Sequence, residues 1–169
     1  MKTLFLFLAL AFPLVPAHAG KSPINGKTQD NAETKLSNAL ATAKAQGKKV
    51  FLRFSDTWCG HCIRMQKILD RPNMKASFGA DLVDLKVELS LVPGGPKLYA
   101  KYAKPHDGIP WFAILENDGK VSFTSVATNG NVGCPETAAE IQFFIDGLRK
   151  NTKLTQSQLD EIAAEFKKP

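Results

Sequence analysis

Cysteine is scarce in this chain, with three copies among 169 residues, at positions 59, 62 and 134. So few cysteines, in an odd number, exclude a small fold held together by a framework of disulfides. A hydrophobic content of 44% is enough to build an ordinary core instead. The cysteines are therefore better explained by chemistry than by scaffolding.

Long hydrophobic runs and concentrated charge are also missing. The apolar run of residues 4–15 is well short of the roughly 20 residues that a membrane-spanning helix needs. The formal net charge is +6, but the lysines are spread along the chain and no basic block is interleaved with aromatic residues. We therefore expect no nucleic-acid partner. The chain also contains no internal repeat and no low-complexity segment.

The N-terminal residues indicate export. Lys2 precedes the apolar run, which only Pro13 breaks, and Ala17-His18-Ala19 fits the small-x-small cleavage pattern. We predict a signal peptide over residues 1–19, cleaved near Ala19, and a periplasmic or secreted protein. No cysteine follows the cleavage site, which disfavours a lipoprotein. Residues 20–29 are polar and are predicted to be a flexible lead-in to one domain over residues 30–169.

Hydrophobic periodicity and turn signals predict an α/β domain. Helices are expected at residues 30–46, 60–70, 97–103 and 135–150, and a last one follows a capping box made by Thr155 and Gln158. Strands are expected at residues 49–55, 81–89, 111–116 and 120–126, the last two joined by the hairpin signal Asn117-Asp118-Gly119. Pro72 is expected to end the second helix. This order predicts a central mixed β-sheet flanked by helices on both faces, with an extra C-terminal helix.

The most informative motif is Trp58-Cys59-Gly60-His61-Cys62, which follows a predicted strand and opens a predicted helix. Two cysteines with two residues between them, in this setting, indicate redox chemistry. A structural zinc site would need a second pair of ligands, and only Cys134 and the distant His106 are candidates. Covalent haem attachment needs a histidine directly after the second cysteine, where this chain has Ile63. We therefore predict neither a metal nor another cofactor.

Over residues 30–150 the chain resembles the thioredoxin superfamily. The resemblance rests on Phe54-x-x-x-Trp58-Cys59-x-x-Cys62 together with Gly108-Ile109-Pro110, in this order. The CGHC site is similar to that of protein disulfide isomerase, and the surrounding sequence is closer to small secreted bacterial thioredoxin-like proteins. The resemblance implies a thioredoxin fold and a protein thiol–disulfide oxidoreductase. It also implies that Pro110 is preceded by a cis bond and faces the cysteines, with the Ile109 backbone free to pair with a substrate peptide.

Each residue of the motif receives an expected role. Cys59, at the helix N-terminus, is the exposed nucleophile, because free N–H groups and the helix dipole favour its thiolate. Cys62, one turn further, is the more buried resolving thiol. A charged His61 would stabilise the Cys59 thiolate and make the disulfide more oxidising. The alternative for His61 is a solvated turn histidine with little effect.

Three further residues near the motif have open interpretations. Trp58 and Trp111 are candidates for a flat apolar surface that binds substrate peptides, although core packing is as good an explanation for Trp111. Cys134 is either an extra reactive thiol or, as we favour, a buried inert one.

Arg53 is a departure from the family. Many thioredoxins have a buried Asp six residues before the first motif cysteine, where it helps to deprotonate the resolving thiol, and Arg53 stands at that position. We predict that Arg53 pairs with Asp84 or Glu88 on the next strand, since an unpaired buried cation is costly. The alternative is that Arg53 reaches the sheet edge and solvent.

The sequence leaves the direction of electron flow open. His61 favours oxidation or isomerisation, whereas Ile109-Pro110 and the lack of a large inserted helical domain favour reduction. The expected partners are protein disulfide or dithiol substrates, with a membrane-embedded electron donor or acceptor as a further candidate. A different class of function is a non-catalytic module that captures a metal such as Cu(I) on the two thiolates. Only Met65 lies near the motif and no methionine-rich run occurs, which counts against it.

Overall fold

A central mixed sheet organises the molecule, whose computed structural model describes residues 31–168. The strands lie in the order β2-β1-β3-β4. β1 is parallel to β2, whereas β3 is antiparallel to both β1 and β4. Their bounds are β1 Lys49–Ser55, β2 Leu82–Glu88, β3 Trp111–Leu115 and β4 Val121–Thr124. The mixed sheet expected from the sequence is confirmed.

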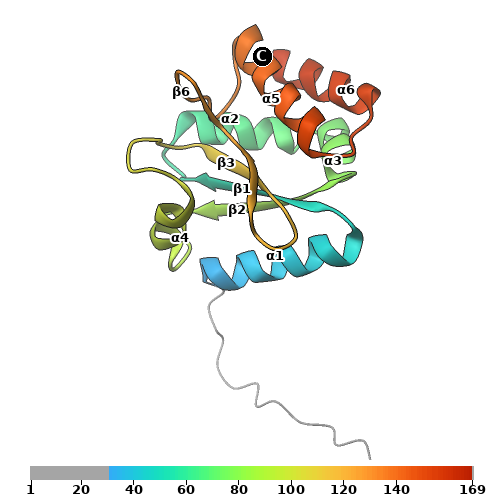
Figure 1. The fold of residues 1–169 in the computed structure, drawn as a ribbon. Coiled ribbons are helices and arrows are strands. Elements are labelled where there is room, and N and C mark those ends of the chain that lie inside the picture. Colours follow the sequence, from blue (N-terminus) through green and yellow to red (C-terminus); the bar gives the residue numbers. More distant parts are fainter. Residues whose placement is uncertain (1–30, 169) are drawn as a thin grey trace, which may run out of the picture.

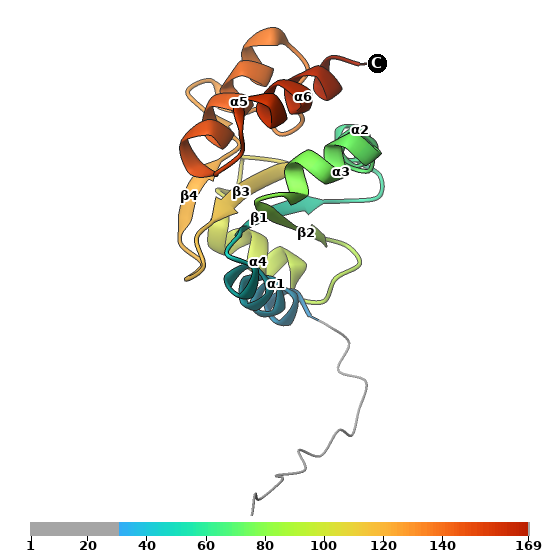
Figure 2. The same cartoon turned by 90° about the vertical axis from the view of Figure 1, so that its right-hand side faces the viewer.

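Helices cover both faces of this sheet, as predicted (Figures 1 and 2). One face carries α1 (Ala32–Gln46) and α4 (Gly95–Tyr102). The other face carries α2 (Gly60–Leu69), α3 (Pro72–Gly79), α5 (Ala138–Asn151) and the extra C-terminal helix α6 (Gln156–Lys167). Two hydrophobic cores follow from this layering, one on each side of the sheet.

The β1 strand is buried on both faces because it lies inside the sheet between two helical layers. Successive side chains of a strand point to opposite faces. Phe51 therefore joins Phe112 and Phe144 in the core beneath α5, at ring distances of 5.1 and 6.3 Å. Phe54 packs in the other core. Arg53 shares the face of Phe51, which places this cation on the side of α2.

The predicted element bounds need three corrections. Pro72 is the first residue of α3, a helix that was not predicted. At this position a helix needs no hydrogen bond from the backbone N–H that proline lacks. The helix predicted from residue 135 begins at Ala138, because Thr137 caps it through a capping box with Glu140. A short hairpin was also missed, made of β5 (Val126–Ala127) and β6 (Gly130–Asn131).

The last helix begins as predicted, with Thr155 and Gln158 forming its capping box. Residues 31–168 contain no helix that is long and apolar enough to cross a membrane. The predicted signal peptide and lead-in, over residues 1–29, lie outside the described residues, so the predicted domain bounds stay a prediction.

Candidate redox-active site

The two motif cysteines meet in the first turn of α2. The chain leaves β1 at Ser55, and Cys59 becomes the N-cap of α2 with extended backbone angles. Its sulfur accepts a hydrogen bond from the backbone N–H of Cys62 at 3.2 Å. The two cysteines form a disulfide, with Cα atoms 5.2 Å apart. The sulfur of Cys59 thus stands where the free N–H groups and the dipole of a helix favour negative charge.

Cys59 is the more accessible cysteine, as expected, but it is less exposed than predicted. In this disulfide its exposed fraction is 6%, against 2% for Cys62. The cause is the loop that carries Ile109, whose carbonyl oxygen lies 3.6 Å from the Cys59 sulfur. The neighbouring Trp58 is 75% exposed and forms the open side of the site.

The loop of Pro110 faces the disulfide, and the Ile109–Pro110 bond is cis, as the resemblance implied. Three contacts that the sequence did not suggest fix the position of this loop. The side-chain amide of Asn131 donates to the Pro110 carbonyl at 2.8 Å. Gly133 lies so close that a Cβ atom there would be 2.6 Å from the same carbonyl oxygen. On the α4 side, the Tyr99 hydroxyl donates to the Gly108 carbonyl at 3.0 Å.

His61 has an acidic partner that sequence analysis missed. Its Nδ1 atom lies 3.0 Å from a carboxylate oxygen of Glu136, which also lies 3.7 Å from a guanidinium nitrogen of Arg64. A hollow of about 240 Å³ lies between this pair and Pro110. The His61 ring beside the cysteines is therefore in direct contact with a carboxylate, which would balance a positive charge on the ring.

Cys134 is buried next to the site and forms no disulfide. Burial raises the pKa of its thiol, and a hydrogen bond from Arg64, at 3.0 Å to the sulfur, opposes this effect in part. The same guanidinium also donates to the carbonyl groups of Pro135 and Phe166. A raised thiol pKa means little thiolate at neutral pH, which supports the inert interpretation.

The two tryptophans do not form a shared surface, and of the two interpretations of Trp111 core packing is confirmed. Trp111 is 1% exposed and packs against Phe54 in the core, with ring centroids 5.8 Å apart. Its place in the middle of the sheet, on β3, explains this burial. Trp58 alone is available at the surface.

A carboxylate anchors the loop that carries Trp58. Asp56 is buried, accepts a hydrogen bond from the Ser90 hydroxyl, and also accepts one from the Thr57 N–H at 2.9 Å. The bond from Ser90 is the main reason why the pKa of Asp56 lies below its usual range. This ionised group ties the loop before the cysteines to the segment that follows β2.

The predicted pairing of Arg53 is confirmed for Asp84. Two guanidinium nitrogens of Arg53 donate to the two Asp84 oxygens at 2.6 and 2.7 Å, and one also donates to Gln66 on α2 at 2.8 Å. Arg53 is 3% exposed and the Asp84 side chain is 38% exposed. Glu88 instead pairs with Lys86, at 3.0 Å. Where many thioredoxins have a buried acid, this protein therefore has the cation Arg53. The Asp84 carboxylate on β2 balances its charge.

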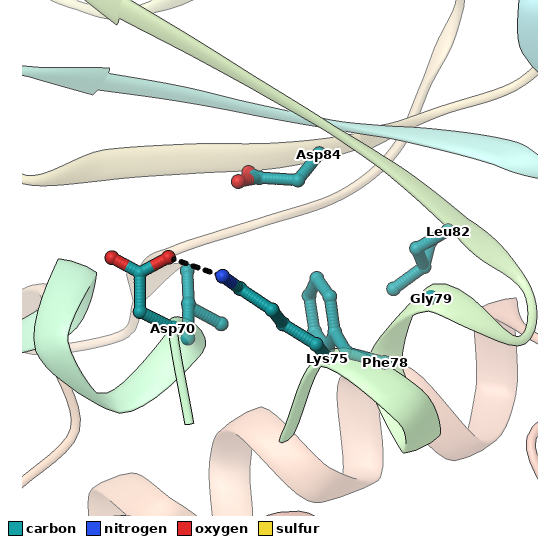
Figure 3. A pocket seen from close by; sticks show the side chains of 7 residues that line it. Asp70, Lys75, Phe78, Gly79, Leu82 and Asp84 are labelled. Atoms are coloured by element: carbon teal, nitrogen blue, oxygen red, sulfur yellow. Dashed lines mark ion pairs between the residues drawn. The ribbon is translucent and has the colours of Figure 1, made fainter. Parts of the chain in front are cut away.

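Asp84 borders a hollow of about 210 Å³ between β2, α2 and α3. Figure 3 shows the Asp84 carboxylate together with the ion pair between Asp70 and Lys75, which are 3.1 Å apart. Gln66 connects the Arg53–Asp84 pair to the Asp70–Lys75 pair, because its side chain accepts a hydrogen bond from Arg53 and donates one to Asp70 at 2.7 Å. The hydrogen bond from Gln66 is the main cause of a lowered pKa at Asp70. A chain of polar contacts therefore runs from β1 across α2 to α3.

Within residues 31–168 no group of three or more His, Cys, Asp or Glu side chains is placed to hold a metal ion. The arrangement brings together a helix-capping cysteine, a second cysteine disulfide-bonded to it, and the half-buried backbone of Ile109 beside the first. These are the parts needed for exchange between a dithiol and an external disulfide.

The chain is similar to a known family and to several solved structures. A family described as thioredoxin-like matches residues 31–116. A disulphide isomerase from Xylella fastidiosa Temecula1 is similar in structure, with 28% identity and a TM-score of 0.51, over 60% of this chain and 77% of that one. A thioredoxin from Thermus thermophilus has 22% identity and a TM-score of 0.48, over 67% of this chain and 81% of that one. The oxidised C-terminal domain of DsbD from Neisseria meningitidis has 22% identity and a TM-score of 0.48, over 72% and 97%. No curated protein matched the sequence.

Proposed function

Because this chain belongs to the thioredoxin-like family, we propose that it is a protein thiol–disulfide oxidoreductase whose Cys59–Cys62 pair exchanges with protein substrates. The observation that carries the proposal is the disulfide in the first turn of α2, with the Cys59 sulfur 3.6 Å from the Ile109 carbonyl. The similar disulphide isomerase from Xylella fastidiosa Temecula1 adds support for this class of chemistry.

The exchange begins with reduced protein. The Cys59 thiolate attacks one sulfur of a substrate disulfide, a mixed disulfide forms, and one substrate thiolate leaves. The Cys62 thiolate then attacks the Cys59 sulfur, which expels the second substrate sulfur as a thiolate and closes the Cys59–Cys62 disulfide. The substrate gains two electrons and the protein loses two. Oxidation of a substrate dithiol is the same sequence in reverse.

The site supports three roles for its other residues. The N–H of Cys62 and the helix N-terminus stabilise the Cys59 thiolate. Trp58 offers an exposed apolar face to the substrate chain. Ile109 offers its backbone on the opposite side, in a loop that Pro110 and its contacts to Asn131 hold in place.

We further propose that the protein works outside the cytoplasm. Residues 1–19 support this, with Lys2, the apolar run of residues 4–15 and a cleavage pattern ending at Ala19. In that compartment a reductase needs an electron donor and an oxidase an acceptor, and a membrane-embedded protein can supply either. Cell fractionation combined with N-terminal sequencing of the native protein tests the location: a mature chain that begins at Gly20 supports it, and an uncleaved cytoplasmic chain contradicts it.

The activity is tested with pre-reduced protein and a fluorogenic peptide disulfide in a single turnover. Wild-type protein should reduce one disulfide per molecule, and Cys59→Ser should be inactive. Cys134→Ala is the matched control, because Cys134 is a thiol of the same chain that forms no disulfide. It should keep wild-type activity. Equal rates for wild type and Cys59→Ser would overturn the proposal.

A further inference from the structure

A basic hollow of about 340 Å³ lies along α2, starting at the residue that follows Cys59. It is lined by Gly60, Ile63, Arg64, Lys67, Arg71 and, from the C-terminal end of α6, Lys168. Figure 2 shows this end of α6 beside α2. The hollow is distinct from the one between His61 and Pro110, and the exchange chemistry described above makes no use of it.

The helical repeat explains why these residues form one surface. Positions three or four apart lie next to one another on a helix, and residues 60, 63, 64 and 67 follow that spacing. The opposite side of α2, with Cys62, Met65 and Leu69, is buried in the protein. The hollow is therefore the outer surface of the same helix whose first turn holds the redox pair.

Among residues 31–168, the charge of this surface is positive after the ion pairs are counted. Arg64, Lys67, Arg71 and Lys168 contribute four cations. Glu165 is buried and pairs with both Arg71 and Lys168, and Glu136 lies 3.7 Å from Arg64. Within the described part of the chain, four cations against two carboxylates leave a net charge of about +2. Within residues 31–168, no carboxylate forms an ion pair with the exposed Lys67.

We propose that this hollow binds an acidic segment of the substrate polypeptide, adjacent to the cysteine that reacts with Cys59. The inference rests on the proposed function, since it concerns which substrates reach the redox pair. A net positive surface attracts carboxylates. Ile63, at 43% exposed, adds an apolar contact for the neighbouring side chains. A second copy of this chain is a poor occupant, because its formal net charge is itself +6.

The geometry sets where the acidic residues must be. A helix rises 1.5 Å per residue, so Lys67 stands about 10 Å along α2 from Gly60. An extended chain advances about 3.3 Å per residue and covers this distance in about three residues. A substrate whose cysteine is attacked by Cys59 therefore places acidic residues over the hollow when they lie about two to five positions from that cysteine.

Three peptide disulfides provide the test, and they differ only at positions two to five from the cysteine. These positions carry Glu and Asp in the acidic peptide, Gln and Ser in the neutral peptide, and Lys in the lysine peptide. Pre-reduced protein should react fastest with the acidic peptide at low salt. The acidic preference should fall to nearly nothing at about 1 M salt, where charges are screened beyond about 3 Å. Lys67→Glu should slow the reaction with the acidic peptide by about three- to tenfold and speed the reaction with the lysine peptide.

Lys44→Glu is the matched control. Lys44 is an exposed lysine in the last turn of α1, as Lys67 is in the last turn of α2, but α1 covers the other face of the sheet. The variant has the same change in net charge and should keep the wild-type preference. An equal loss in both variants would mean that overall charge, rather than the hollow, selects the substrate.

A binding measurement separates this inference from the proposed function. The three peptides with serine in place of cysteine are titrated against oxidised protein by fluorescence anisotropy. Tighter binding of the acidic peptide, weakened by Lys67→Glu and not by Lys44→Glu, supports the docking site even if no exchange occurs. Exchange with all three disulfides at one rate, without an acidic preference in binding, overturns the inference and leaves the proposed function intact.

Discussion

Gly133 is predicted to position the loop that faces the redox pair. A Cβ atom at this residue would lie 2.6 Å from the Pro110 carbonyl oxygen, and its φ of +58° is a region that other L-residues rarely adopt. Gly133→Ala therefore combines backbone strain with a steric clash. The strain costs about 1–2 kcal/mol. Relief of the clash requires Pro110 to move, and an overpacked contact of this kind costs about 1–3 kcal/mol more.

Gly47→Ala separates these two contributions. Gly47 has a φ of +65°, ends α1, and has no atom within 4 Å of an added Cβ. Gly47→Ala should therefore be destabilised by backbone strain alone. This loss is reduced by about 0.4–1 kcal/mol because alanine restricts the unfolded chain. Guanidinium unfolding of both oxidised variants gives the difference in the free energy of unfolding, and single-turnover exchange gives the rate.

We expect Gly133→Ala to be less stable than Gly47→Ala by about 1–3 kcal/mol, and to exchange more slowly because the Ile109 carbonyl is displaced from Cys59. Gly47→Ala should keep the wild-type rate. If the two variants unfold at the same denaturant concentration and exchange at equal rates, the contact between Gly133 and Pro110 does not position the loop, and the reasoning is refuted.

Three other substitutions test the electrostatics of the fold and site. His61→Pro should lower the reduction potential of the pair in a glutathione titration, by about 30 mV for each 1.4 kcal/mol of lost thiolate stabilisation, and no change would make His61 a bystander. Arg53→Ala should lower the free energy of unfolding, measured in urea, by about 2–3 kcal/mol. The loss is smaller than for a fully buried pair because the Asp84 side chain is 38% exposed. A loss below about 0.5 kcal/mol would contradict a stabilising role for the pair. The pKa of Glu140 is lowered in the folded protein, mainly by a hydrogen bond from the Thr137 N–H. The ionised carboxylate therefore stabilises the fold at pH values above the pKa that Glu140 has in the unfolded chain. This stabilisation is lost as the pH falls through the lower pKa of the folded state. Glu140→Gln should lose less stability than wild type in urea titrations across that acidic range, and parallel curves would contradict this.

Local sequence was sufficient for the elements that carry the chemistry. The strand before Cys59, the helix that begins with Gly60, and the loop of Pro110 each have a strong short-range signal: a buried apolar run, a cysteine at the N-cap, and a Gly-Ile-Pro sequence. A partner for Arg53 could be expected on the next strand because an isolated buried cation is costly, but the sequence did not choose between Asp84 and Glu88.

Long-range contacts could not be predicted. His61 and Glu136 are 75 residues apart, and no local pattern connects them. Asn131, in a short hairpin that periodicity does not detect, and Gly133, two residues after it, both contact Pro110. The α3 helix was missed for another reason: Pro72 was interpreted as the end of one helix, when the same rigid φ also suits the first residue of the next.

The most direct test of the central claim is to trap the mixed disulfide and locate it. Cys62→Ser leaves Cys59 without a partner to resolve the intermediate, so adducts with substrate protein should accumulate and disappear under dithiothreitol. Peptide mapping by mass spectrometry should find the substrate cysteine bonded to Cys59 and not to Cys134. Cys59→Ser should yield no adducts. Adducts on Cys62 in the Cys59→Ser protein, with none on Cys59 in Cys62→Ser, would contradict the assignment of Cys59 as the attacking thiol.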